Sequence, residues 1–151
     1  MVNKGCMRIS VLNFGSDVKK ACEFFGNPKY IRNLPFLHDF PNNSCEIVTA
    51  FLASAIASKY NIQSVKVIHA RSPDKSEQHF WLEVGEIIVD ATAHQFKNHK
   101  TPLVCLRPNP LEKQFPHLAQ TTSDIAMSNL EFLSPQLKIL ILNELTVKIT
   151  T

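Results

Sequence analysis

The sequence predicts an α+β fold in which one central helix, beginning at a cysteine, packs on an antiparallel sheet. After Pro41, a run without Gly or Pro over 44–60 has apolar residues at helical spacing and begins with residues that cap helices. Downstream, apolar and polar residues alternate over 79–84, and a mostly apolar run follows over 87–92. Gly85-Glu86 joins the two segments, which is the pattern of a β-hairpin. A chain of 151 residues has the size of one domain, which we expect to span 1–151.

The remaining elements follow from the same signals, taken in chain order. Before the central helix we expect a strand over 7–14, a helix over 18–25 capped by Ser16-Asp17, and a proline-containing ordered loop or short helix over 27–41. After it we expect a strand over 65–70, the hairpin, a polar loop over 97–120 that holds a short strand at 103–106, a helix over 123–132, and a helix over 135–145 capped by Ser134. The length of the polar loop predicts an excursion that covers or gates a site.

Cys45 stands in the first turn of the central helix. Unpaired backbone N–H groups and the positive end of the helix dipole favour a thiolate there. Asn42, Asn43 and Ser44 precede it; each can cap the helix, and the amide of Asn42 or Asn43 can also donate to an oxyanion. We therefore take Cys45 as a candidate nucleophile and the three preceding residues as candidate oxyanion or substrate contacts.

The hairpin supplies the candidate partners of this thiol. With a two-residue turn, Val84 faces Ile87 and Trp81 faces Asp90, so that His79 and Asp90 share one face as diagonal neighbours, about 7–8 Å apart at Cβ. That separation is within hydrogen-bonding reach of the two side chains. A one-residue slip of the register would move them to opposite faces, so the pairing of His79 with Asp90 depends on the predicted turn.

A Cys that opens a long helix, then His-x-Trp-x-Glu on a strand, then Val-Asp-x-Thr on the returning strand, resembles the transglutaminase-like branch of the papain-like superfamily. The resemblance covers about 42–96 and keeps the order Cys, His, Asp. It implies a papain-like core and gives Cys45, His79 and Asp90 the roles of nucleophile, base and orienter of the base. That branch includes bacterial cysteine peptidases, papain-fold toxins and glutamine deamidase effectors.

Each of these residues also has a plainer interpretation. A lone Cys at a helix start is commonly a small buried hydrophobe, and a lone His or Asp in a hairpin is commonly structural. Their conjunction in order, on one face, favours the triad. His38-Asp39 and His94 are rival sources of a base, and His94 can instead line the cleft. Trp81 is either a cleft wall or an ordinary hairpin aromatic.

Composition excludes several other classes. The net charge of +3 comes from scattered basic residues, whereas a nucleic-acid-binding surface clusters them. No apolar run has the length of a membrane span, and the start lacks a signal peptide, which predicts a cytoplasmic protein or one exported by a signal-less route. The four Cys show no metal-ligand spacing and the four Gly form no phosphate loop, so we expect neither a metal nor a cofactor.

These features together predict a thiol-dependent amide hydrolase or acyltransferase that acts on a protein or peptide. Glutamine deamidation, proteolysis and transamidation all remain open, and the resemblance implies an effector or toxin, for which a cognate inhibitor or host target is the expected partner. The alternative is an inactive papain-like fold that serves as a protein-binding module. An active enzyme should have one hyper-reactive thiol that depends on His79, and a binding module should have none.

Overall fold

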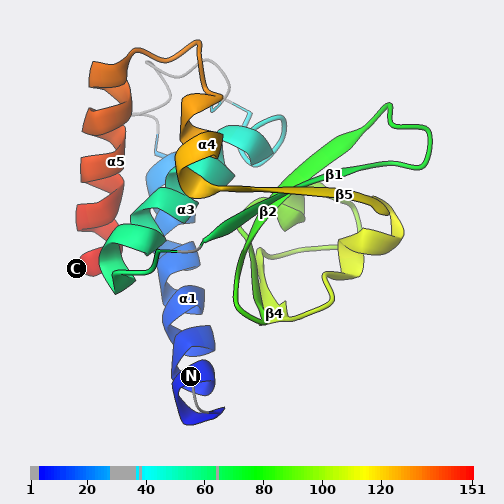
Figure 1. Cartoon of the computed structure of the whole chain (residues 1–151), viewed down its shortest axis with the longest axis horizontal. Coiled ribbons are helices and arrows are strands. Elements are labelled where there is room, and N and C mark those ends of the chain that lie inside the picture. Colours follow the sequence, from blue (N-terminus) through cyan, green and yellow to red (C-terminus); the bar gives the residue numbers. More distant parts are fainter. Residues whose placement is uncertain (1–3, 28–36, 38, 64) are drawn as a thin grey trace.

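The computed structural model describes residues 4–27, 37, 39–63 and 65–151, and it confirms the α+β class (Figure 1). The α-helices in these ranges are α1 (Lys4–Phe25), α3 (Cys45–Tyr60), α4 (Ser123–Ser128) and α5 (Pro135–Thr150). The strands are β1 (Lys66–Arg71), β2 (Gln78–Val84), β3 (Ile87–Asp90), β4 (Leu103–Leu106) and β5 (His117–Thr122). Two 3₁₀ helices, η2 (Ala93–Gln95) and η3 (Pro110–Lys113), lie in the connections.

The five strands form one antiparallel sheet in the order β4-β3-β2-β1-β5. Val84 pairs with Ile87, and Leu82 pairs with Val89, so the predicted two-residue turn and register of the hairpin are confirmed. Gly85 has a φ of +59°, which a residue without Cβ adopts at little cost. Strand β3 ends at Asp90, two residues earlier than expected, and Ala91 and Thr92 form a turn.

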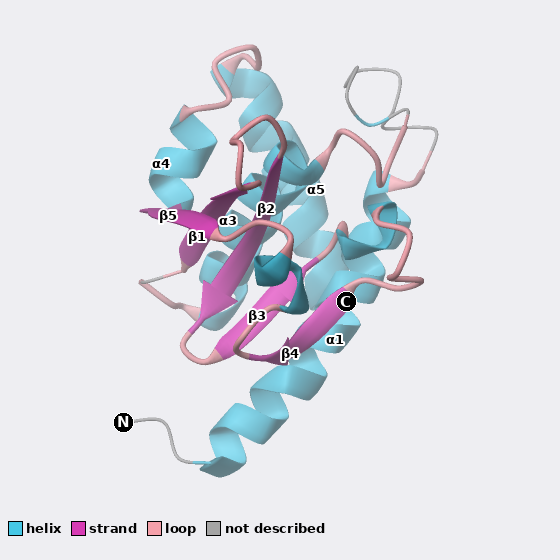
Figure 2. Cartoon of the chain, turned by 90° about the vertical axis from the view of Figure 1, so that its right-hand side faces the viewer, coloured by secondary structure: helices cyan, strands magenta, loops and turns pink. Residues whose placement is uncertain are grey.

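Helices and loops cover opposite faces of the sheet, as Figure 2 shows. On the helical face, α1, α3 and α5 enclose the larger core, to which the hairpin contributes Phe80, Leu82 and Val89. On the other face, a smaller cluster includes Trp81, Ile88, Leu111 and Phe115. Alternation along β2 thus sends Phe80 into the main core and His79 to the opposite face.

The central helix α3 confirms the prediction within one residue at its start. Buried residues occupy nearly all its sides from Ile47 to Ile56, as expected of a helix slim enough to be packed on several faces. The helix is followed by Asn61, which has the left-handed conformation common after helices. The N–H of Asn61 bonds to the carbonyls of Ala57 and Ser58.

In the first 25 residues the predicted strand is wrong, whereas the predicted helix is confirmed as part of a longer one. The expected strand over 7–14 and helix over 18–25 form one continuous helix, α1, which ends before Gly26 as predicted. Buried or half-buried Val11, Phe14 and Val18 follow the spacing of a helix face, and that period dominates the weak alternation. Gly15 interrupts the pattern without breaking the helix.

Asp17, expected to cap a helix, is instead fully buried within α1. Its two oxygens accept hydrogen bonds from Lys59 Nζ and Tyr60 Oη, each at 2.6 Å. The same ammonium group donates to the carbonyl of Ile149 at 2.8 Å. This network joins α1, α3 and α5 behind the sheet, because a buried carboxylate is tolerated only with such partners.

The C-terminal half contains more structure than the sequence predicts. The strand at β4 and the cap of α5 by Ser134 are confirmed, since the Ser134 hydroxyl accepts from Leu137 N. The rest of the expected loop over 97–120 contains η3 and most of β5, which pairs with β1 along its length. Helix α4 is shorter than expected and α5 longer. Most of the expected loop over 27–41, with His38, lies outside the described residues.

Candidate active site

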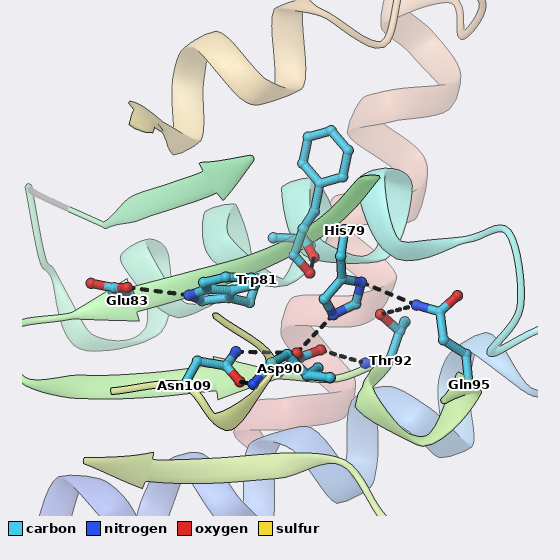
Figure 3. Close-up of polar contacts among 10 residues, drawn as sticks. His79, Trp81, Glu83, Asp90, Thr92, Gln95 and Asn109 are labelled. Atoms are coloured by element: carbon cyan, nitrogen blue, oxygen red, sulfur yellow. Dashed lines mark hydrogen bonds and ion pairs between the residues drawn. The ribbon is translucent and has the colours of Figure 1, made fainter. Parts of the chain in front are cut away.

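His79 and Asp90 form a buried, hydrogen-bonded pair on the face of the sheet opposite the main core (Figure 3). Nε2 of His79 lies 2.8 Å from Oδ2 of Asp90, and both side chains have no exposed surface. The other carboxylate oxygen, Oδ1, accepts from the backbone N–H of Thr92 at 3.2 Å. The predicted register therefore brings the two residues together, and the turn after β3 holds the carboxylate in place.

Cys45 reaches this pair from the other side of the sheet. The pairing of β2 with β3 runs from Leu82 to Val84, so His79, at the start of β2, lies beyond it. The hydroxyl of Thr49, one turn further along α3, donates to the carbonyl of Phe80 at 3.3 Å and anchors the helix beside His79. The Cys45 side chain lies close enough to the imidazole to contribute to the raised pKa of His79. Nε2 of His79 is bonded to Asp90, and Nδ1 is the other ring nitrogen.

The surroundings of His79 favour its charged form. Burial alone would lower its pKa, but the hydrogen bond to Asp90, the one to Cys45 and the charges of both partners raise the pKa to about 9. An imidazolium next to a thiol is the environment that stabilises a thiolate. His79 and Asp90 are thus joined by a hydrogen bond, and Cys45 lies near the imidazole.

Two further residues, which the sequence did not indicate, contact the His79–Asp90 pair. Asn109, which is buried, donates from Nδ2 to Oδ2 of Asp90 at 3.4 Å, and its Oδ1 accepts from Leu111 N at 2.8 Å. Gln95, in η2, places its amide nitrogen 3.1 Å from Nδ1 of His79. Both come from the segment after Asp90. The sequence indicated only that a polar loop follows the hairpin, and it did not single out these two residues.

Aromatic side chains from the same segment pack around His79. Phe96 meets its ring edge to face at 4.8 Å between centroids, and Phe115 lies 5.8 Å away. Trp81 lies 5.9 Å away and is fully buried, so it is a wall beneath the imidazole and presents no surface to a ligand. Its indole donates to Glu83 at 3.2 Å, and Glu83 in turn pairs with Arg107 at 3.2 Å. From the 97–120 segment, Phe115 therefore packs against His79.

The residues before Cys45 are placed differently from one another. Ser44 is buried and occupies the cap position of α3, but its hydroxyl donates back to the carbonyl of Pro41 at 3.1 Å and makes no cap hydrogen bond. The first N–H groups of α3 are thus not taken up by that side chain. Asn42 and Asn43 are exposed, and the amide of Asn43 lies 3.4 Å from Asp39.

His94 is close to the triad but does not join it. It lies in η2, its ring meets Phe40 at 5.6 Å, and burial lowers its pKa although the charge of Asp90 opposes this. His94 therefore has less support as the base than His79, which is hydrogen-bonded to Asp90 and lies near Cys45. Among the described residues, no group of three or more His, Cys, Asp or Glu is placed to hold a metal ion.

Burial raises the pKa of two other thiols. It raises the pKa of Cys22 to about 12, with a further contribution from Glu23, and it raises that of Cys105, with a further contribution from Asp90. No helix in the described part of the chain is both long and apolar enough to cross a membrane.

Comparison with known proteins gives no family for this chain: no family model matches it, and neither the curated proteins nor the solved structures include a significant match.

Proposed function

We propose that the chain is a thiol-dependent amide hydrolase or acyltransferase with a Cys45–His79–Asp90 triad, acting on a protein or peptide. The observation that carries the proposal is the buried hydrogen bond between His79 and Asp90, with the Cys45 side chain close enough to contribute to the raised pKa of the imidazole. A papain-like core in which a helix presents the Cys and a sheet presents the His and Asp is part of the same proposal. A structural role alone does not require a Cys, a His and an Asp to meet in this order.

The chemistry follows from the positions of the three groups. The Cys45 thiolate attacks the carbonyl carbon of an amide, and the carbonyl electron pair moves to the oxygen. N–H groups in the first turn of α3, with Asn42 or Asn43 as a further donor, stabilise the oxyanion. His79 transfers the proton on Nδ1 to the departing nitrogen, and the C–N bond breaks to leave an acyl thioester.

The acyl group then passes to a second nucleophile. His79 takes a proton from water, which attacks the thioester, releases the acid and restores the thiol. Asp90 keeps Nε2 hydrogen-bonded throughout, which leaves Nδ1 for proton transfer. If ammonia leaves from a glutamine side chain the reaction is deamidation, if a peptide amine leaves it is proteolysis, and if an amine replaces water it is transamidation.

The test is brief, substoichiometric alkylation with iodoacetamide at pH 6.5, read by intact mass and peptide mapping. In the wild type we expect label on Cys45 in preference to Cys6, Cys22 and Cys105. In His79→Ala and the more conservative His79→Gln we expect that selectivity to be lost. His69→Gln is the matched control, because His69 is also on the sheet and in an aromatic contact, with Phe80, but outside the triad.

Circular dichroism and thermal unfolding of each variant show whether it is folded before its thiols are compared. Labelling that is slow in the wild type, or that spreads over several thiols, would overturn the proposal of an enzyme and support the alternative of a binding module. Selective labelling justifies incubation with candidate proteins, in which a mass gain of about one dalton indicates deamidation and new termini indicate proteolysis.

A further inference from the structure

The side-chain amide of Gln95 lies at the nitrogen of His79 that the proposed reaction uses. Its Nε2 is 3.1 Å from Nδ1 of His79 and 3.5 Å from the hydroxyl of Thr92 (Figure 3). Asp90 occupies Nε2 on the opposite side of the ring. An imidazole nitrogen has one lone pair or one proton in the ring plane, so Gln95 at Nδ1 keeps a second partner, such as the Cys45 thiol, from bonding to that nitrogen.

We infer that Gln95 is a positioning residue whose side-chain amide caps Nδ1 of His79 in the resting site, and that substrate must displace it. An amide N–H can donate to Nδ1 only when that nitrogen carries no proton. The contact therefore favours neutral imidazole and a Cys45 thiol, whereas Asp90 favours imidazolium and a thiolate. The inference rests on the proposed function, because it concerns the same pair of groups.

The position of the cap also matches the chemistry. In the proposed reaction the departing nitrogen must lie within hydrogen-bonding distance of Nδ1 to receive its proton. The nitrogen of Gln95 is already at that distance, so it occupies the place of the leaving group. Gln95 is half-buried at the end of the short helix η2, so its side chain borders on solvent and can rotate away.

Few other groups can titrate near this contact. The titratable groups that interact electrostatically at the site, besides His79, are Asp90 on β3, Cys45 on α3, His94 on η2 and Cys105 on β4. Around the ring, Trp81, Phe96 and Phe115 are uncharged, and Glu83 on the same strand is held by Trp81 and Arg107. A change confined to the amide of Gln95 therefore reports on His79 and Cys45.

The test is the pH dependence of Cys45 alkylation by iodoacetamide, measured on the full chain for the wild type and Gln95→Met, which keeps the length of the side chain without its amide. We expect the profile of the variant to shift to lower pH, with a rate at pH 6 about three- to tenfold higher, the size expected for loss of one neutral hydrogen bond. Gln120→Met, an exposed change on β5, is the control and should leave the profile unmoved.

Gln95→Leu provides a second variant if the first is unstable. Its side chain also lacks the amide, so its profile should shift in the same direction. An unchanged or slower rate at pH 6 in both variants, with Cys45 still selectively labelled, would overturn the cap and leave the triad intact. Loss of selective labelling in the wild type itself would instead overturn the proposed function.

Discussion

Asn109 donates to the same oxygen of Asp90 that receives the hydrogen bond of His79. The carboxylate oxygen Oδ2 lies 3.4 Å from Nδ2 of Asn109 and 2.8 Å from Nε2 of His79. Asn109 follows β4 and precedes η3, so the path of the excursion fixes the orientation of a group on the hairpin.

Asn109→Ala should therefore weaken the site as well as the fold. It removes a donor to a buried carboxylate and the cap of η3, and loss of such hydrogen bonds costs about 1–3 kcal/mol of unfolding free energy. We expect slower alkylation of Cys45 at pH 6.5, because Asp90 is less well oriented toward His79. Urea unfolding and alkylation kinetics measure the two effects. A stability loss with unchanged Cys45 kinetics would restrict Asn109 to a structural role.

The stability of the protein should depend on pH through His79. Its pKa is about 9 in the folded chain against 6.5 for the free side chain, so the folded state binds this proton more tightly. The resulting stabilisation is fully present below 6.5 and is lost as the pH rises through about 9. The unfolding free energy of the wild type should fall in that window relative to His79→Gln, and parallel curves for the two proteins would contradict the assignment.

Asp17→Ala should destabilise the helical layer without changing the chemistry of the thiol. It leaves Lys59 without its buried partner, and breaking a buried ion pair costs about 3–5 kcal/mol. We expect the lower end of that range, because the Lys59 side chain is 24% exposed. Chemical denaturation with Glu131→Ala as an exposed control measures the loss. Equal stability in the two variants would mean that the network contributes little.

Cys22 should behave as an inert thiol. Its pKa of about 12 keeps it protonated at pH 8, and its Sγ lies 3.5 Å from the carbonyl of Ala91. We expect it to remain unlabelled by iodoacetamide at pH 8 in the folded protein and to react after unfolding in urea. The ratio of the two rates by peptide mapping is the measurement. Fast labelling in the folded state would show that α1 opens readily from the sheet.

The parts of the fold that sequence predicted are those with local signals. The central helix has a long uninterrupted pattern, and the hairpin has a turn whose geometry sets the register. Strand β5 lacked such a signal, since five of its six residues are exposed, and its pairing with β1 supplies the order that its own sequence does not. Helix α1 was predicted as a strand and a helix, because 7–14 alternates weakly and Ser16-Asp17 can cap a helix, whereas the spacing of its buried residues is that of one helix.

The site divides in the same way. Cys45, His79 and Asp90 were predicted because their elements are local and their order matches a known pattern. Asn109 and Gln95 could not be predicted, because neither belongs to a periodic segment, and only the path of the chain over the sheet places them at Asp90 and His79. Trp81 was assigned to the correct face, but whether that face is covered depends on Phe115 and its neighbours.

The pairing of β5 with β1 has a consequence for how the molecule assembles. Strands β1 to β4 pair with their sequence neighbours, whereas Arg71 finds His117 only after a long loop has closed. Such distant contacts form slowly, because chain entropy is lost before the contact compensates for it. Leu111 and Phe115 lie within that loop, and Phe115 packs against the ring of His79. We therefore expect a newly made chain to form its hairpin before this imidazole is shielded from water.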